Sequence, residues 1–505
     1  MLLSDLLSGT GLDFDLHGCD VDITCITSDS RRVRRGCLYI AVDGFHVDGH
    51  RYLTDACVNG AVAVAVSREA LRGGRIILDE KITAVAFDDT RLAMSHLFSA
   101  WYSHPQRSLR MIGVTGTNGK TSVARLIYEI LSRSSVRCGL IGTIGIISPG
   151  GELKRRNNDA LANMTTPDPE QLYEILARMR DDGAEAVVME VTSHALALSK
   201  VAPIRFEIGI FTNLTEDHLD LHGDMESYFE VKSRLFEQSC KAIVNIDDAY
   251  GRRLSEIISK KALCPILTCS REGRAAMLSA TDVTLSPTGI EYKISSSSLR
   301  ARIRSRLMGE FNVMNTLEAI GCAHILGVPP REIKQAIADI PNISGRLEKI
   351  KLDGKCNFSV YIDYAHTPDA LECLLRSARI MACRGERIVL LFGCGGDRER
   401  QKRALMGKIA ASMADYFIVT GDNCRSESPH AIIEDILSGI DGESSYTVIE
   451  DRKEAIEYAV KNARDGDIII LAGKGHEEYE IIGNERRPFS EKEIVYRAYE
   501  KYRVE

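Results

Sequence analysis

The stretch Met111-Ile-Gly-Val-Thr-Gly-Thr-Asn-Gly-Lys-Thr121 decides the fold of this chain. The apolar residues 109–114 predict a buried strand, and an apolar repeat after Lys120 predicts a helix that begins where the stretch ends. Glycines between a strand and a helix let backbone N–H groups approach phosphate oxygens, and the helix N-terminus adds partial positive charge. We therefore expect a nucleotide-binding loop on a parallel α/β sheet.

The side chains of this loop suit a nucleotide with bound magnesium. Lys120 can reach the β- and γ-phosphates, and the hydroxyl of Thr121 can bind Mg²⁺. The spacing differs from the general G-x-x-x-x-G-K-T pattern, because position 114 is valine while Gly113 and Gly116 are the nearest glycines. A glycine-rich turn with a solvated lysine is the alternative. The placement of Gly, Lys and Thr at the mouth of the helix favours the nucleotide site.

Length and composition place the chain among globular proteins. Its 505 residues suggest about three domains of roughly 150 residues each. Apolar content of 44%, charged content of 27% and a net charge of −7 give no reason to expect nucleic-acid or membrane-surface binding. The 14 cysteines never form C-x-x-C and follow no signal peptide, so we expect reduced thiols in a cytoplasmic protein. No apolar run is long enough for a membrane span.

The pattern along the chain predicts three α/β domains. Residues 1–105 form a smaller N-terminal unit, 106–340 a central P-loop ATPase-type unit, and 341–505 a Rossmann-like, doubly wound unit. Near the end of the central unit, alternation over 283–307 predicts antiparallel strands. The arginines that alternate there could bind phosphate, but a solvated strand face is favoured; they are Arg300, Arg302, Arg304 and Arg306.

Two segments of the central unit carry candidate metal ligands. A buried strand over 184–191 contains Glu190 near its end, where a carboxylate is well placed to hold Mg²⁺ beside the phosphate loop. The spacing of His218 and His222 could suggest zinc, but the neighbouring Asp and Glu residues favour magnesium. Spacing alone indicates a solvated surface position for Lys232, on a helix over 228–236.

Polar loops follow the strands of the first and last units. In the last unit, strands over 358–362, 388–392, 416–420 and 467–472 lead into polar loops that together predict a site at one sheet edge. In the first unit, the loops 26–32 and 43–50 flank a strand over 36–42. Those two loops could hold a small polar ligand, although such loops are more often simple turns.

These motifs resemble those of the Mur ligases, which build the peptide of bacterial cell-wall precursors. The matching segments occur in order along the whole chain: Asp29–Arg31, Asp48–His50, Gly116–Thr121, Asn213–His218 with Lys232, Gly309–Asn315, Ser344–Arg346, Asp363–Pro368, Gly395–Arg398, Asp422–Arg425 and Gly473–Glu477. The resemblance implies a cytoplasmic ATP-dependent ligase of peptidoglycan synthesis, acting as a monomer. It implies addition of meso-diaminopimelate to the D-glutamate side chain of UDP-N-acetylmuramoyl-L-Ala-D-Glu through an acyl phosphate.

Three alternatives stand beside this interpretation. One is a ligase of the same family that adds L-lysine; Arg425 argues against it, because the extra carboxylate of diaminopimelate needs a cation. Another is a folylpolyglutamate synthetase, disfavoured by the segments Asp29–Arg31 and Asp422–Arg425. The third, a nucleotide switch without chemistry, predicts no cluster of carboxylate and histidine metal ligands.

The resemblance also implies roles for individual residues. ATP would be bound by Gly116, Thr117, Asn118, Gly119, Lys120, Thr121, Ser122, Asn315 and Arg346. One Mg²⁺ would lie on Thr121 and Glu190, and a second on His218 and a carboxylated Lys232. The UDP-dipeptide would meet Ser28, Ser30, Phe45, His46, Val47, Thr165, Thr166, Thr192 and Lys200. Diaminopimelate would meet Arg398, Asp422, Asn423, Cys424, Arg425, Gly473 and Glu477, with Cys424 where these relatives have proline.

Overall fold

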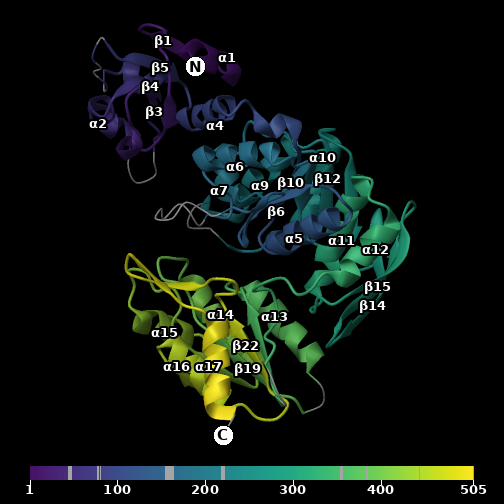
Figure 1. Cartoon of the computed structure of the whole chain (residues 1–505). Helices are drawn as coiled ribbons and strands as arrows, with labels where there is room; N and C mark the ends of the chain where they lie inside the picture. The colour runs from purple at the N-terminus through teal and green to yellow at the C-terminus, as the bar shows by residue number, and fades with distance from the viewer. Residues whose placement is uncertain are drawn as a thin grey trace.

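The computed structural model describes residues 1–43, 48–74, 76, 79, 81–153, 164–217, 222–352, 356–382, 385–442 and 444–503. Its strands form sheets of five, eleven and six strands, which follow one another along the chain, and a separate two-stranded hairpin. Figure 1 shows the three large sheets in three successive bodies, from purple through teal to yellow. The α/β fold expected from the sequence is therefore confirmed.

The central sheet is built around the strand that precedes the glycine loop. This strand, β6 (Arg110–Thr115), lies between two parallel neighbours, β10 (Ala186–Glu190) and β11 (Ile208–Phe211). Met111 packs into the core on one face, and Ile112 and Val114 into the core on the other, as the two-residue period of a strand requires. The parallel part continues through β7 (Cys138–Gly142), β12 (Ala242–Asn245) and β13 (Ile266–Ser270).

Helices cover both faces of this sheet, and further strands extend its edges, most of them in antiparallel pairs. The helices are α5 (Lys120–Arg133), α6 (Pro169–Asp181), α7 (Ser193–Ala197), α9 (Met225–Glu237), α10 (Ala249–Lys260), α11 (Phe311–Ile325) and α12 (Pro330–Asp339). The edge strands are β8 (Gly145–Ser148), β9 (Gly151–Glu152), β14 (Leu278–Ser286), β15 (Gly289–Ser295) and β16 (Arg300–Ser305). The predicted antiparallel strands are confirmed, and the exposed Arg302 and Arg304 pair with Glu291, as a solvated face predicts.

The N-terminal sheet has the order β1-β5-β4-β3-β2, with only β1 antiparallel to its neighbour. Its strands are β1 (Asp15–His17), β2 (Cys25–Thr27), β3 (Cys37–Ile40), β4 (Ala61–Ser67) and β5 (Thr83–Phe87). Its helices are α1 (Leu3–Thr10), α2 (Leu53–Val58), α3 (Arg68–Arg72) and α4 (Thr90–Trp101), and the short 3₁₀ turns cover Ser30–Arg32, Gly49–Tyr52 and Pro105–Ser108.

The expectation that every cysteine is a reduced thiol is wrong for one pair. Cys25 on β2 and Cys37 on β3 are register partners, 4.5 Å apart at Cα, and form a disulfide. Parallel pairing places the two residues opposite each other, which their separation along the chain does not reveal. The other cysteines in the described ranges are free. Within those ranges, no helix combines the length and apolarity needed to cross a bilayer.

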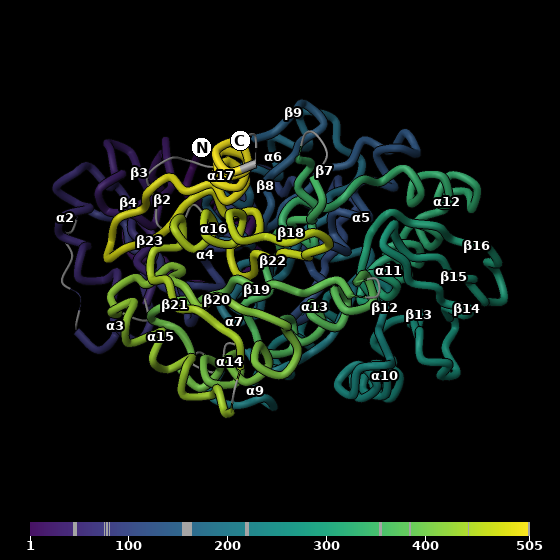
Figure 2. Tube along the Cα trace, turned by 90° about the horizontal axis from the view of Figure 1, so that it is seen from below, coloured from purple at the N-terminus to yellow at the C-terminus, as the bar shows by residue number. Residues whose placement is uncertain are grey.

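The C-terminal sheet is doubly wound, as predicted. Its order is β17-β18-β22-β19-β20-β21, comprising β17 (Glu348–Lys349), β18 (Ser359–Asp363), β19 (Ile388–Phe392), β20 (Tyr416–Val419), β21 (Tyr446–Val448) and β22 (Ile468–Ala472). One face packs on α13 (Pro368–Met381), α14 (Gln401–Met413) and α15 (Pro429–Leu437), and the other on α16 (Arg452–Lys461) and α17 (Glu491–Arg503). Figure 2 shows these two helical layers on opposite sides of β19 and β22. The hairpin is β23 (Tyr479–Ile482) and β24 (Glu485–Pro488).

A buried arginine ties the loops of this last sheet together. Arg403 on α14 is 0% exposed and donates to both carboxylate oxygens of Glu427, at 2.8 and 2.9 Å. It also donates to Asp435 at 2.9 Å and to the carbonyl of Gly395. A buried guanidinium needs such partners, so these contacts hold the loop after β19, the loop before α15, and α15 itself in one arrangement.

This cluster predicts a specific loss of stability in acid. Hydrogen bonds from Arg403 lower the pKa of Glu427 from 4.5 to about 2. A lowered carboxyl pKa stabilises the folded state above pH 4.5, and that contribution disappears as the pH falls toward 2. We expect Glu427→Gln to lower Tm at pH 7 and to flatten the fall in Tm between pH 5 and 3. Thermal unfolding at several pH values measures this, with the exposed Glu434→Gln as control. Parallel Tm profiles for wild type and Glu427→Gln would contradict it.

Candidate active site

The glycine loop lies between β6 and α5, where neighbouring side chains leave no space for a Cβ at two of its positions. Gly116 has φ +144°, and a Cβ there would lie 1.9 Å from the hydroxyl oxygen of Thr212. Gly119 has φ +86°, and its Cβ would lie 2.7 Å from Oδ1 of Asn315. Both positions therefore require glycine, which allows the close backbone approach that a phosphate-binding turn needs.

The segment after β11 holds this loop in place. The backbone N–H of Asn118 donates to Oδ1 of Asn213 at 2.9 Å, and that of Thr117 donates to the carbonyl of Asn213 at 2.9 Å. The hydroxyl of Thr212 donates to the carbonyl of Asn118 at 2.6 Å. Because β6 and β11 are neighbours in the sheet, their C-terminal loops meet here, and the loop is preorganised.

Thr121 and Glu190 come together as predicted. The hydroxyl of Thr121 donates to the Glu190 carboxylate at 2.9 Å, and Arg346 donates to the same hydroxyl at 3.0 Å. Glu190 is almost fully buried, and Thr143 also donates to its carboxylate through the backbone N–H and the hydroxyl. A hydroxyl and a carboxylate beside a phosphate loop are the hard oxygen ligands that Mg²⁺ takes, so these residues fit that ion.

Lys120 and Lys232 converge on one backbone carbonyl. Nζ of Lys120 donates to the carbonyl of Gly116 at 3.0 Å, and Nζ of Lys232 donates to the same oxygen at 2.8 Å. Burial lowers the pKa of Lys120. Burial, and then the charge of Lys120, lower the pKa of Lys232 well below its ordinary value. Two amines so close together, in a region shielded from water, create a strong preference for an anion.

The surface position expected for Lys232 from spacing is wrong. The side chain is 2% exposed and its Nζ lies 4.7 Å from the ring centroid of Tyr228. The apolar residues Tyr228, Phe229, Leu235 and Phe236 mark the buried face of α9, and Lys232 falls on that face at helical spacing. This position on the apolar face of the helix could have predicted the burial of Lys232 from the sequence. His218, the other proposed ligand on this side, lies outside the described residues.

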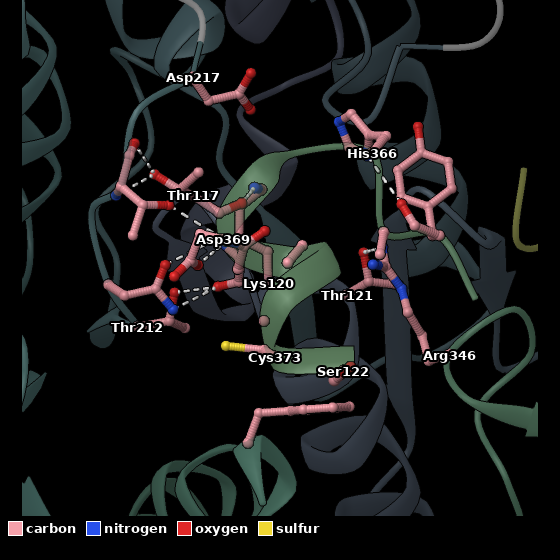
Figure 3. A pocket seen from close by; sticks show the side chains of 18 of the residues that line it. Thr117, Lys120, Thr121, Ser122, Thr212, Asp217, Arg346, His366, Asp369 and Cys373 are labelled. Carbon is pink, nitrogen blue, oxygen red and sulfur yellow. Dashed lines mark hydrogen bonds between the residues drawn. The ribbon is translucent and has the colours of Figure 1, made fainter. Parts of the chain in front are cut away.

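The C-terminal sheet supplies the opposite wall of the site. A cavity of about 640 Å³ is lined by loop residues of the central sheet and by the C-terminal residues Tyr364, His366, Asp369, Arg398, Asp422, Asn423, Arg425, Gly473 and Glu477. Figure 3 shows Arg346, His366 and Asp369 facing the loop that carries Lys120 and Thr121. Asn118 donates to Asp369 across this junction at 3.0 Å. The cavity therefore combines the C-terminal edges of two sheets.

The predicted residues of the last unit surround a buried polar network. Asn423 donates to Glu477 at 2.9 Å and accepts from the ammonium of Lys474 at 3.0 Å. Arg425 donates to the carbonyl of Gly396 at 2.7 Å. Arg398 and Arg425 both line the cavity, and burial, followed by the charge of Arg398, lowers the pKa of Arg425. Cys424 is buried, with its thiol toward the carbonyl of Ile481 at 3.8 Å, and is not a lining residue.

The residues predicted to bind a UDP-linked substrate are spread more widely. Thr165 and Thr192 line the cavity. Thr166 is not a lining residue, and its hydroxyl donates a hydrogen bond to the carbonyl of Glu190. Lys200 is buried and pairs with Asp168 at 2.6 Å. Ser28 and Ser30 lie at the end of β2 in the N-terminal sheet, and Phe45, His46 and Val47 lie outside the described residues.

Several cavity residues were not singled out in the sequence, although His366 lies in the predicted motif Asp363–Pro368. Thr143 contacts Glu190 directly, and His366 and Asp369 face the phosphate loop. Burial lowers the pKa of His366 to about 4, which keeps its ring neutral. Thr143 follows β7, so the rule that ligands bind at the C-terminal edge of a parallel sheet could have identified it.

Fold and site together define a P-loop nucleotide-dependent enzyme whose cavity is completed by a second doubly wound sheet. Family comparison is more specific: residues 22–102 match the catalytic domain of the Mur ligase family, 114–323 the Mur ligase middle domain, and 345–475 the Mur ligase glutamate ligase domain. The chain belongs to the Mur ligase family.

Similar proteins cover almost the whole chain. The UDP-N-acetylmuramoyl-L-alanyl-D-glutamate–2,6-diaminopimelate ligases of Clostridioides difficile (strain 630) and Caldanaerobacter subterraneus subsp. tengcongensis are each 40% identical over 498 residues. These matches cover 98% of this chain and 99% and 98% of the two relatives. A solved structure of a ligase with the same name has a TM-score of 0.65 and 31% identity, covering 95% of each chain.

Proposed function

We propose that this chain is an ATP-dependent ligase that joins meso-diaminopimelate to the side-chain carboxylate of D-glutamate in UDP-N-acetylmuramoyl-L-Ala-D-Glu. The reaction forms an amide and converts ATP to ADP and phosphate, as a step of peptidoglycan precursor synthesis in the cytoplasm. In this proposal, residues 1–105 bind the UDP-sugar, 106–340 bind ATP, and 341–505 bind the amino acid.

One observation carries the proposal. The phosphate loop and Glu190 open into the same cavity as Arg398 and Arg425. A nucleotide on the loop would therefore direct its phosphates toward a region that attracts the carboxylates of an amino acid. Two ligases named for this activity are 40% identical to the chain over nearly its full length. This similarity supports the choice of substrates.

The first chemical step activates a poor electrophile. The γ-phosphoryl group moves to an oxygen of the D-glutamate carboxylate; its bond to ADP breaks, and an acyl phosphate forms. Lys120 and the loop N–H groups bind the phosphates and align them with the carboxylate, which is the main contribution a protein makes to phosphoryl transfer. Thr121 and Glu190 would hold Mg²⁺, which neutralises phosphate charge when bound.

The second step forms the amide. The uncharged amine of diaminopimelate attacks the acyl carbon, phosphate leaves with the electrons of the C–O bond, and the nitrogen loses a proton. Arg398 and Arg425 would orient the amino acid through its carboxylates, while Asn423 holds Glu477 in position for an ammonium group.

We further propose that Lys232 is carboxylated in the active enzyme. An amine reacts with CO₂ only when it is uncharged, and the low pKa of Lys232 favours that form. The amine nitrogen bonds to the carbon of CO₂ and releases a proton, so the product is an anion and repulsion from Lys120 becomes attraction. Together with His218, the new carboxylate would hold a second Mg²⁺ beside the phosphate loop.

The overall reaction predicts a strict dependence of ATP turnover on the acceptor. With diaminopimelate present, phosphate release should require Mg²⁺ and the UDP-dipeptide together, because the acyl phosphate has to form before the amine can displace phosphate from it. Lys120→Ala should reduce turnover by roughly a hundredfold or more, with Tm unchanged within a few degrees. A phosphate-release assay measures this. Full ATP turnover without a carboxylate acceptor would refute the proposal.

The role of Lys232 predicts loss and chemical rescue. Lys232→Ala should lose nearly all activity, since it removes a metal ligand, and an added short carboxylate should restore part of it. Labelling with ¹³C-bicarbonate should give a carbamate signal in the wild type that is absent from the variant. Lys260→Ala, on the exposed side of α10, is the matched control. A fully active Lys232→Ala enzyme without a carbamate signal in wild type would exclude the role.

The choice of amino acid predicts a role for Arg425. Diaminopimelate carries one carboxylate more than lysine, and the planar guanidinium of Arg425 can bind it through two hydrogen bonds. Wild type should prefer diaminopimelate, and Arg425→Ala should lower kcat/KM for it by roughly a hundredfold while changing that for lysine little. Arg425→Lys, which keeps the charge, should be intermediate. A wild-type preference for lysine, or an unchanged preference in Arg425→Ala, would show that the assignment is wrong.

A further inference from the structure

A buried carboxyl group without a partner lies on the central side of the cavity. Glu318 on α11 is 0% exposed, and neither of its carboxyl oxygens has a hydrogen-bond partner within the described part of the chain. Burial raises the pKa of Glu318 well above its ordinary value, which favours the neutral acid over the carboxylate. An unpaired buried polar group is unfavourable, and its presence calls for a ligand that pairs with it.

Glu318 belongs to the face of α11 that forms the cavity wall. Phe311, Met314, Asn315 and Glu318 follow the i, i+3, i+4, i+7 spacing of one helical face, and all four line the cavity. Asn315 lies beside the phosphate loop, because its Oδ1 is 2.7 Å from the Cβ position of Gly119. Glu318 is one turn further along the helix, away from the loop.

The part of the cavity beside α11 suits the base of a nucleotide. The other end, at Thr121 and Glu190, faces the junction with Arg346, where the terminal phosphate has to meet the second substrate. The base must then lie on the α11 side. The polar side chains there are already engaged within the protein: Asn245 donates to the carbonyl of Thr212, and Asp247 accepts from Ser270. Among the described residues on this side of the cavity, Glu318 is the buried carboxyl whose two oxygens have no hydrogen-bond partner.

We propose that Glu318 recognises adenine. Its carboxyl accepts a hydrogen bond from the 6-amino group and donates one to ring nitrogen N7. A neutral acid offers the same acceptor and donor as a side-chain amide, and amides pair with adenine in this way. Guanine presents two acceptors, O6 and N7, on the corresponding edge, so one oxygen of the acid would face an acceptor. The carboxyl is covered in this structure, so the proposal requires rotation about the glutamate side-chain bonds to bring the carboxyl to the base. The inference rests on the proposed function only in requiring that the chain bind ATP.

Nucleotide binding tests this without any ligase assay, so a failure of the proposed reaction would leave the test intact. Calorimetric titration of the full chain compares ADP, GDP and purine riboside 5′-diphosphate, which lacks the 6-amino group. Wild type should bind ADP more tightly than the purine riboside analogue by roughly ten- to a hundredfold. Glu318→Leu should weaken ADP to the level of the analogue and leave the affinity for the analogue unchanged. Glu318→Gln should keep most of the preference, because the amide restores one donor and one acceptor.

A control on the same helix separates recognition from packing. Cys322→Ala alters a buried residue one turn beyond Glu318 that is not a lining residue, and it should leave the ratio of ADP to analogue affinity unchanged. The proposal is overturned if Glu318→Leu, or Glu318→Ala where leucine prevents folding, keeps the wild-type ratio. Equal wild-type affinities for ADP and the analogue would overturn it without any variant.

Discussion

The carbonyl of Gly116 accepts hydrogen bonds from two buried lysines, and the chemistry of the whole site depends on that convergence. Lys120 reaches the oxygen from α5 and Lys232 reaches it from α9, on opposite faces of the central sheet. Burial opposes two ammonium charges so close together, and it lowers the pKa of each group. An anion beside the two amines would relieve this conflict, and both the phosphates of ATP and the carboxylate proposed for Lys232 are anions. The fold thus holds two amines in a buried position that favours the binding of an anion.

The second constraint is that neither large sheet completes the cavity alone. Arg346 enters from the segment between the two sheets and donates to Thr121, while Asn118 of the phosphate loop donates to Asp369 at the start of α13. These contacts connect the phosphate loop to the cavity wall that carries Arg398 and Arg425. The proposed acyl-phosphate intermediate needs such an arrangement, since it has to meet an amine before it meets water. The buried cluster around Arg403 supports the same wall from behind, by fixing the loops from which the arginines project.

Sequence patterns predicted those parts of the site that depend on local structure and on strand order. The loop from Gly116 to Thr121 follows from a strand, a glycine turn and a helix, and β19 matches its predicted bounds of 388–392. The meeting of Thr121 with Glu190 follows from the rule that parallel strands end at a common edge, and the structure confirms it. Lys232 shows how a residue type can mislead: lysine is usually exposed, but its position on the apolar face of α9 indicated burial. The Cys25–Cys37 disulfide had no such signal, because strand register is not a local property.

The sequence by itself determined the α/β class, the phosphate loop and the order of the candidate motifs, because periodicity and turn chemistry act over a few neighbouring residues. Only the tertiary structure decided which side chains share a cavity. Arg425 and Thr121 are far apart along the chain, yet both line one space, whereas Cys424 next to Arg425 is turned into the core. The unpaired acid of Glu318 also emerged only from packing, since a lone glutamate in a helix is normally solvated. Burial and hydrogen-bond pairing are set by long-range contacts, and these arise only once the sheets and helices have come together.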